Sequence, residues 1–309
     1  MASPRKFLIL AKIETTQFTD PVPTPAANSI LVKNLRVTPL RVESEDRALI
    51  RPYFGNSEQL PVMEEAMIEF DVEVAGSSAL GTAPKWGPLV RATGFAEVIS
   101  AGVSVTYNPV SAAFEYLTIY AYRDGLLYKM TGCHGSVSMD FAAKRIPHMH
   151  YRFVGKYVAV SDAAIPAGSD FSAFQTPKAS IPTWTGTLTV DAFAAKVAAL
   201  SVDMQSEVSH AIWMNAETIQ PVDRKPRGSI TVEQVTVATY NYFTKITGAN
   251  LVALALTHGT VATNRVKVTA PKMQLVDIEE ADFEGTSAHR LNVTFAPNTG
   301  NDEVAIEVT

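Results

Sequence analysis

The sequence predicts a mainly β protein made of two domains related by an internal duplication. Short apolar runs alternate with turn residues from Ser29 onward, helical patterns are few, and both halves show strands, one helix closed by glycine, a hairpin and further strands. Of the 309 residues, 47% are hydrophobic and 18% are charged, which suits two hydrophobic cores and excludes a largely disordered chain. We therefore expect two folded domains.

Period-two alternation of apolar and polar residues marks the strands. The run 67–74 places its three carboxylates, Glu69, Asp71 and Glu73, on one face and apolar side chains on the other. This wet, acidic face is expected to look at solvent or a channel. Asp124-Gly125 lies between two strand-like runs, and an Asp-Gly pair supplies the positive φ that a tight hairpin needs.

Two segments carry helical signals. Ala83 to Thr93 follows Thr82 as a possible N-cap and ends at Gly94, and Val235 to Thr247 ends before Gly248. A third segment, Ala192 to Leu200, fits a helix or a strand equally well.

Proline-rich segments set the domain boundaries. Pro166, Pro177 and Pro182 interrupt regular structure between the halves, which predicts a linker at 166–182 between domains at 29–165 and 183–309. Residues 1–28, which include Pro21, Pro23 and Pro25, are expected to form an extended arm that a neighbouring molecule orders.

A short sequence echo supports the duplication. His134-Gly135-Ser136-Val137 and Pro147-His148-Met149 recur 124 positions later as His258-Gly259-Thr260-Val261 and Pro271-Lys272-Met273. The helix ends differ by another offset, and an alternative match of Asp124-Gly125 with His258-Gly259 preserves the order of elements better. The register of the repeat therefore stays open.

Candidate catalytic and metal-binding residues find weak support. Adjacent strand residues such as Cys133 and His134 point to opposite faces, so they cannot act as nucleophile and base. His148 and His150 share a strand face and with His134 could hold a metal, although a polar stripe on a solvent-facing sheet explains them better.

Other residue groups also favour structural roles. Gly76 to Gly81 lacks the Lys-Ser/Thr pair of a phosphate-binding loop, and the pairs Glu64-Glu65 and Glu279-Glu280 are expected on solvated turns or strand ends. Trp86, Trp184 and Trp213 are expected to be core or interface anchors. We expect no catalytic residue, no metal and no cofactor, and hence no enzyme.

The segment 42–62 is the strongest candidate for a functional site. It is too long for a hairpin connection, and it carries the Arg, Tyr and Phe content of a contact surface. The contact candidates are Arg47, Arg51, Tyr53, Phe54 and Asn56.

Charge and hydropathy limit the partners. The net charge of −5 lacks the basic excess of a protein that grips nucleic acid, and no run approaches the roughly 18 apolar residues of a membrane span. The first residues lack the features of a signal peptide, so synthesis in the cytoplasm is expected.

Several segments together resemble the tail tube (major tail) proteins of long-tailed, non-contractile bacteriophages and related prophages. In the first half they are Arg51–Asn56, Phe70–Glu73, the run Gly81 to Ala92, Gly94-Phe95 and Val105–Pro109, and in the second half Asp223–Ile230, Thr269–Leu275 and Asn301–Glu303. The resemblance covers nearly the whole chain.

The resemblance implies β-sandwich or barrel-like tube domains, each with a flanking helix, that assemble into stacked rings around a DNA channel in the virion tail. The loop 42–62 would reach the adjacent ring, and Glu69, Asp71 and Glu73 would face the lumen. Two tube domains per chain imply trimeric, pseudo-hexameric rings, whereas one implies hexamers. Expected partners are further copies of the chain, a tape-measure protein, a tail terminator and tail-tip proteins, with assembly in the host cytoplasm.

Two alternatives stay open from the sequence. A head or tail decoration protein would share the β-rich composition, and a tail-associated cell-wall hydrolase would need two carboxylates in one cleft.

Overall fold

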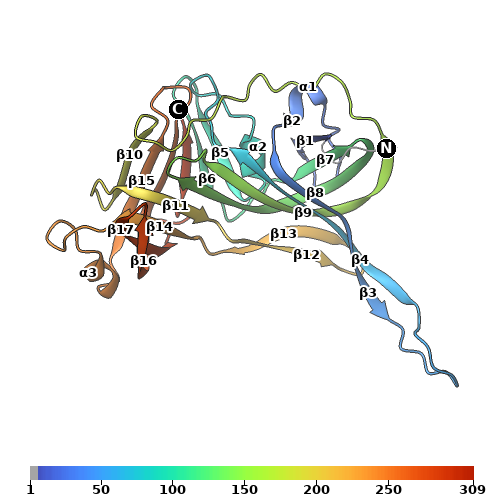
Figure 1. The fold of residues 1–309 in the computed structure, drawn as a ribbon. Helices are drawn as coiled ribbons and strands as arrows, with labels where there is room; N and C mark the ends of the chain where they lie inside the picture. Colours follow the sequence, from blue (N-terminus) through green and yellow to red (C-terminus); the bar gives the residue numbers. More distant parts are fainter. Residues whose placement is uncertain (1–5) are drawn as a thin grey trace.

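Strands dominate the computed structural model, which describes residues 6–309. They hold 55% of these residues and helices hold 5%, which confirms the mainly β prediction. One 16-stranded sheet, not closed into a barrel, contains all strands except β12 and β13, which form a separate two-stranded ribbon. Figure 1 shows the two halves side by side, with a long hairpin leaving the first.

The elements of the first half are, in chain order, β1 (Phe7–Ile13), α1 (Pro25–Asn28), β2 (Ser29–Ile30), β3 (Lys33–Asp46), β4 (Gln59–Glu73), α2 (Gly87–Arg91), β5 (Phe95–Ser100), β6 (Ser104–Pro109), β7 (Leu117–Arg123), β8 (Gly125–Ala142) and β9 (His148–Ala163). Those of the second half are β10 (Thr185–Val190), β11 (Val197–Asp203), β12 (Ser206–Ile212), β13 (Glu217–Arg224), β14 (Arg227–Glu233), α3 (Tyr242–Thr247), β15 (Leu251–His258), β16 (Val266–Phe283), β17 (Thr286–Phe295) and β18 (Ala305–Val308).

The same strand order occurs twice. In the first half the neighbours run β1-β7-β8-β9-β4-β3, and in the second half they run β10-β15-β16-β17-β14-β11. In each half a helix, α2 or α3, follows the matching strand β4 or β14. This repeated topology supports the predicted duplication on grounds independent of sequence identity.

The repeat register follows the element order. Asp124-Gly125 forms the β7–β8 turn, with Gly125 at φ 103°, and His258-Gly259 ends the matching strand β15. The echo at 124 positions is therefore the wrong register, because His134 lies inside β8 whereas His258 ends β15.

Strand pairing joins the two halves into one body. β11 pairs with the end of β8 from Ser138 to Ala142, and β18 pairs with β6. One hydrophobic core contains buried residues of both halves. The segment 166–182 carries no helix or strand, and Phe174 anchors it against this core. The division into domains at 29–165 and 183–309 stays a prediction, and the two units share one hydrophobic core.

The N-terminal segment differs from the expected arm. Residues 1–5 lie outside the described residues, but β1 is paired along its whole length with β7. Leu8 to Ala11 are buried because the apolar run meets a core on each face, Ile9 and Ala11 on one and Leu8 and Leu10 on the other. A full strand, not an arm ordered by a neighbour, occupies 7–13.

The helices are shorter than predicted. α2 covers only Gly87–Arg91 and α3 only Tyr242–Thr247, and the ambiguous segment 192–200 leads into strand β11. Burial explains α2, since Leu89 and Val90 are fully buried, and core packing rather than helix propensity holds this single turn.

Candidate assembly surfaces

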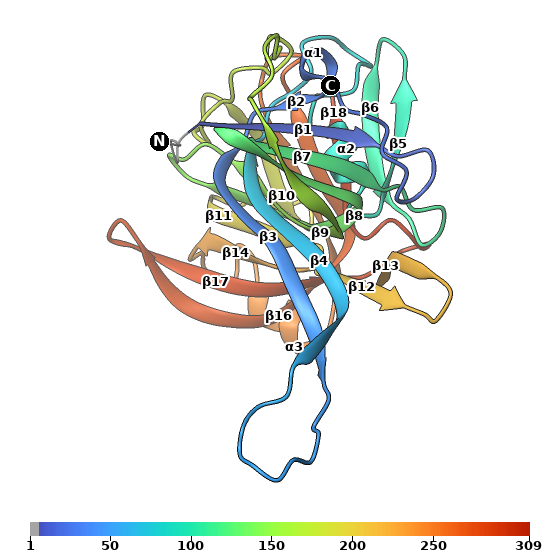
Figure 2. The ribbon, with the colours of Figure 1, turned by 90° about the vertical axis from the view of Figure 1, so that its right-hand side faces the viewer.

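The outer part of the long hairpin β3–β4 is exposed almost throughout. Strand pairing continues from Lys33↔Asp71 out to Asp46↔Gln59, so both ends of the predicted loop 42–62 belong to a ribbon and the connection itself is 47–58. Figures 1 and 2 show the ribbon projecting well beyond the body. Sequence reasoning missed the strands because apolar residues alternate weakly in a ribbon with two wet faces.

The predicted contact residues lie at the tip of this hairpin. Phe54 and Ile50 are fully exposed and Tyr53 is 66% exposed. Arg47 and Arg51 both pair with Glu58, which ties the two sides of the connection together. The tip thus presents bare aromatic and aliphatic side chains on a charged base, the composition of a protein contact surface.

A second hairpin, β12–β13, carries a similar tip that sequence reasoning did not assign. Ile212, Trp213 and Met214 are 48%, 66% and 108% exposed. The ribbon extends the pair β11–β14, as the outer part of β3–β4 extends its own strands. Trp213 is therefore a surface side chain and not a core anchor, whereas Trp86 is buried.

A charged cluster fixes the base of β12–β13 to the first half. His210 contacts Glu217 at 2.9 Å and Glu65 at 3.7 Å, Arg41 contacts Glu65 at 2.9 Å, and Lys156 pairs with Glu217. Burial would raise the pKa of Glu217, but hydrogen bonds from Lys156 and His210 outweigh it and lower this pKa. Glu65 is buried, which corrects its expected place on a solvated turn or strand end.

The face that holds Glu69, Asp71 and Glu73 is outward, as the alternation predicted, because Ile68, Phe70 and Val72 are buried. Its carboxylates are not bare, however. Asp71 contacts His150 and Asn34 at 2.6 Å, Glu73 contacts Lys33 at 2.8 Å, and Glu69 contacts Arg152 at 3.4 Å. Neighbouring strands neutralise the row, so the face is mixed in charge rather than simply acidic.

This polar face continues across eight strands of both halves. Cross-strand partners share a face, and the register gives one row in which every member is polar. The row is Lys33, Asp71, His150, Ser138, Asp203, Arg227, Thr294 and Gln274, on β3, β4, β9, β8, β11, β14, β17 and β16. The opposite face of these strands is buried: Val72, Met149, Met139, Val202, Val293 and Leu275.

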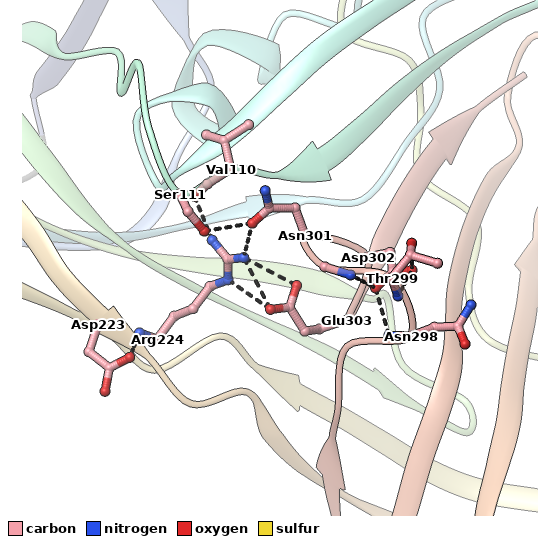
Figure 3. Close-up of polar contacts among 10 residues, drawn as sticks. Val110, Ser111, Asp223, Arg224, Asn298, Thr299, Asn301, Asp302 and Glu303 are labelled. Atoms are coloured by element: carbon pink, nitrogen blue, oxygen red, sulfur yellow. Dashed lines mark hydrogen bonds and ion pairs between the residues drawn. The ribbon is translucent and has the colours of Figure 1, made fainter.

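Arg224 links the two halves through hydrogen bonds and an ion pair. Its guanidinium donates to the Val110 carbonyl at 2.5 Å, to Asn301 at 2.7 Å and to Glu303 at 3.1 Å (Figure 3). Ser111 donates to Asn301 at 2.6 Å. The segments 223–230 and 301–303, far apart in the sequence, thus meet at the end of β6.

Asp302 shapes the loop that presents Asn301 and Glu303. Its carboxylate accepts hydrogen bonds from the backbone of Asn298, Thr299 and Gly300 and from the Thr299 hydroxyl. The Thr299 hydroxyl and these backbone donors lower the pKa of Asp302 to about 2.

The candidate catalytic residues do not assemble into a site. His134 is fully buried between the rings of Phe114 and Tyr116, and neither ring nitrogen has a hydrogen-bond partner. Burial raises the pKa of the Cys133 thiol, which disfavours the nucleophilic thiolate. His148 and His150 lie on the polar face whereas His134 is buried, and among residues 6–309 no group of three His, Cys, Asp or Glu side chains is arranged to hold a metal ion.

A family model described as "Phage tail tube protein" matches residues 6–309, almost the whole chain. No curated protein matches the chain. Among the described residues, no helix has the length and apolar character needed to cross a membrane.

Proposed function

The chain belongs to the phage tail tube protein family, a family of structural components of the virion tail, and we propose that its copies assemble into stacked rings around a channel for genomic DNA. In this proposal three copies form each ring, because every chain supplies two tube units and three chains supply six. The rings stack through the β3–β4 hairpins.

The observation that carries this proposal is the β3–β4 hairpin. A two-stranded ribbon is at best marginally stable alone in water, and this one exposes Leu40, Val42, Leu60 and Val62 along its length in addition to its bare tip. Contact with a second ring would cover these side chains. Arg47, Arg51, Tyr53, Phe54 and Asn56 are the proposed inter-ring contacts.

The eight-stranded polar face supports the proposed channel. Glu69, Asp71 and Glu73 would line the lumen together with the polar rows of the second half. A lumen whose Lys and Arg side chains are balanced by carboxylates offers few free cations to phosphate groups, so DNA would pass without being held. Tape-measure, terminator and tail-tip proteins are the proposed further partners.

Negative-stain electron microscopy of the concentrated protein tests the proposal. We expect hollow tubes from the unchanged chain. A variant in which Arg47 to Gln59 is removed should stay folded, because shortening a connection costs little folding free energy, but it should give single rings only. Normal tubes from this variant would show that the hairpin is not the stacking contact, and dispersed monomers of the unchanged chain with tail-tip partners would favour a decoration protein.

A further inference from the structure

We propose that the β12–β13 ribbon has two positions and that the one in this structure restrains assembly. Here the ribbon lies folded back along the first half, below β8 and β9 in Figure 1. In an assembled tube it rotates about 204–205 and 225–226 and extends β11–β14, so that its apolar tip contacts another copy. This inference rests on the proposed assembly into tubes and identifies an intrachain contact that regulates it.

The ribbon bends where its counterpart in the repeat runs straight. β3 and β4 are 14 and 15 residues long, and they stay paired from the body to the start of the connection 47–58. The matching pair β11–β14 ends at Asp203 and Arg227, and a new ribbon starts at Ser206 and Arg224. Within residues 6–309 no strand pairing joins this ribbon to the main sheet. The second half thus holds a hairpin that could extend as β3–β4 does but is folded back.

Both strands are suited to bending at the break. Gln205 has a φ of 44°, in the left-handed region that a residue with a side chain adopts at a cost, and its amide donates to the Asp203 carboxylate at 2.9 Å. On the other strand, Pro226 has no N–H to donate to a strand ladder. Rotation of Gln205 to an extended φ would join β11 to β12 and remove the strained conformation.

The contact between the ribbon and the first half has the composition of a reversible interface. Beyond the break its contacts are polar: Lys156 with Glu217, the Gln17 amide with the Ile219 carbonyl at 2.6 Å, and His210 with Glu65 at 3.7 Å. A groove of about 500 Å³ with charged side chains of both parts, among them Arg152 and Glu207, lies between the ribbon and the sheet. Permanent interfaces are more apolar and better packed at their centre.

The ions are arranged so that opening leaves none of them buried without a partner. Arg41 pairs with Glu65 at 2.9 Å within the first half, and His210 pairs with Glu217 at 2.9 Å within the ribbon. Rotation of the ribbon separates Lys156 from Glu217, and both side chains then meet water. An ionic contact is costly to break when it leaves a buried charge unpaired, and this one avoids that cost.

Apolar burial sets the balance between the two positions. Folded back, the ribbon covers Ile219 completely but leaves Ile212, Trp213 and Met214 at its tip exposed. In the extended position another copy can cover these three side chains, which outweighs the exposure of one. The folded-back position is therefore favoured in a free chain, and the extended position in an assembly.

A cleavable cross-link tests the two positions. In Lys156→Cys/Glu217→Cys, a short bismaleimide with an internal disulfide bond holds the ribbon folded back, and negative-stain electron microscopy counts tubes before and after reduction. We expect no tubes from the linked protein and tubes after reduction. The matched control is Lys196→Cys/Glu233→Cys, which replaces another Lys–Glu ion pair, beside β11 and on β14, and should form tubes in both states. The native Cys133 is buried and should not react.

The outcomes separate this inference from the proposed function. Tubes from linked Lys156→Cys/Glu217→Cys in the yield of the linked control would overturn the inference and leave the proposed function standing. An absence of tubes that persists after reduction would also overturn it, because the substitutions and not the position of the ribbon would then block assembly. If the unchanged chain never forms tubes, even with tail-tip partners, the proposed function and the inference both fail.

The sign of a single substitution gives a second readout. Lys156→Met removes the ion pair with Glu217 and keeps an unbranched apolar stem beside the Phe18 ring. It should lower the protein concentration needed for tubes about fivefold, whereas Lys196→Met should leave that concentration unchanged. An unchanged or raised concentration for Lys156→Met would show that the folded-back ribbon does not restrain assembly.

Discussion

The buried His134 makes the fold sensitive to acid. Burial lowers its pKa from the ordinary 6.5 to about 4, so between these pH values the unfolded chain binds a proton that the folded chain does not. Stability is therefore fully present above pH 6.5 and falls as the pH drops toward 4. From pH 7 to pH 5 this single group should cost about 2 kcal/mol.

Replacing His134 by leucine should remove that loss. The measurement is urea unfolding of His134→Leu and of the unchanged chain at both pH values, and the quantity compared is the difference between them, so a constant packing defect cancels. His148→Gln, a change on the polar face, serves as the control. Equal acid losses in the variant and the unchanged chain would show that other groups govern the effect.

The Arg224–Glu303 ion pair should contribute more to the stability of the fold than a surface ion pair does. Only 16% of the Arg224 side chain and 10% of the Glu303 side chain are exposed. Arg224→Met leaves the Glu303 carboxylate and the Val110 carbonyl without their donor, and we expect a loss of roughly 3 kcal/mol in the free energy of unfolding.

Two comparisons isolate this effect. Arg224→Met with Glu303→Gln should lose less than Arg224→Met alone, because no charge is then left unpaired. Asp223→Asn breaks the exposed neighbouring pair with Lys225 and should leave stability unchanged. If Arg224→Met lowers the free energy of unfolding no more than Asp223→Asn does, the contacts of Arg224 do not stabilise the association of the two halves.

The hairpin tip should affect assembly without affecting folding. Phe54 is fully exposed, so Phe54→Ser should change the free energy of unfolding by no more than about 0.5 kcal/mol. If Phe54 is an aromatic anchor between rings, the loss of about 2 kcal/mol per contact raises the protein concentration needed for tubes roughly 30-fold. Sedimentation of tubes over a concentration series measures this shift.

Val237→Ser provides the matched control for the tip, because Val237 is 58% exposed on the α3 side of the molecule. It should assemble as the unchanged chain does. Equal assembly of Phe54→Ser and Val237→Ser would remove Phe54 from the proposed contacts.

Elements with one buried face could be predicted from the sequence, and others could not. The alternation in β4 and the Asp124-Gly125 turn were readable because local chemistry determines them. β1 was missed because an apolar run with buried side chains on both faces shows no period of two. α2 and α3 were overestimated because tertiary packing ends them earlier than their caps suggest.

The candidate site was predictable in composition more than in geometry. The aromatic tip of 47–58 and the outward place of Glu69, Asp71 and Glu73 followed from spacing. The cations that neutralise these carboxylates come from β3 and β9, and their positions depend on strand register, which the sequence does not state. Arg224 and Glu303 are 79 positions apart in the chain, and only the fold brings them together.

At the scale of the whole molecule, the duplication accounts for how one chain could build a ring with few copies. Two units share a core and one continuous polar sheet face, so in the proposed three-copy ring half of the contacts between units would lie within the chains.

This arrangement predicts the width of the channel. Each copy supplies eight strands to the polar face, so three copies supply 24. With strands about 4.8 Å apart and tilted by about 40°, the backbone of a closed 24-stranded wall is about 48 Å across, and a side-chain layer of about 5 Å on each side leaves a lumen of about 40 Å. Six copies would double the strand number and give about 85 Å. End-on class averages of frozen tubes measure the width directly. A lumen near 85 Å would replace the three-copy ring with a six-copy ring, because wall circumference scales with the number of strands.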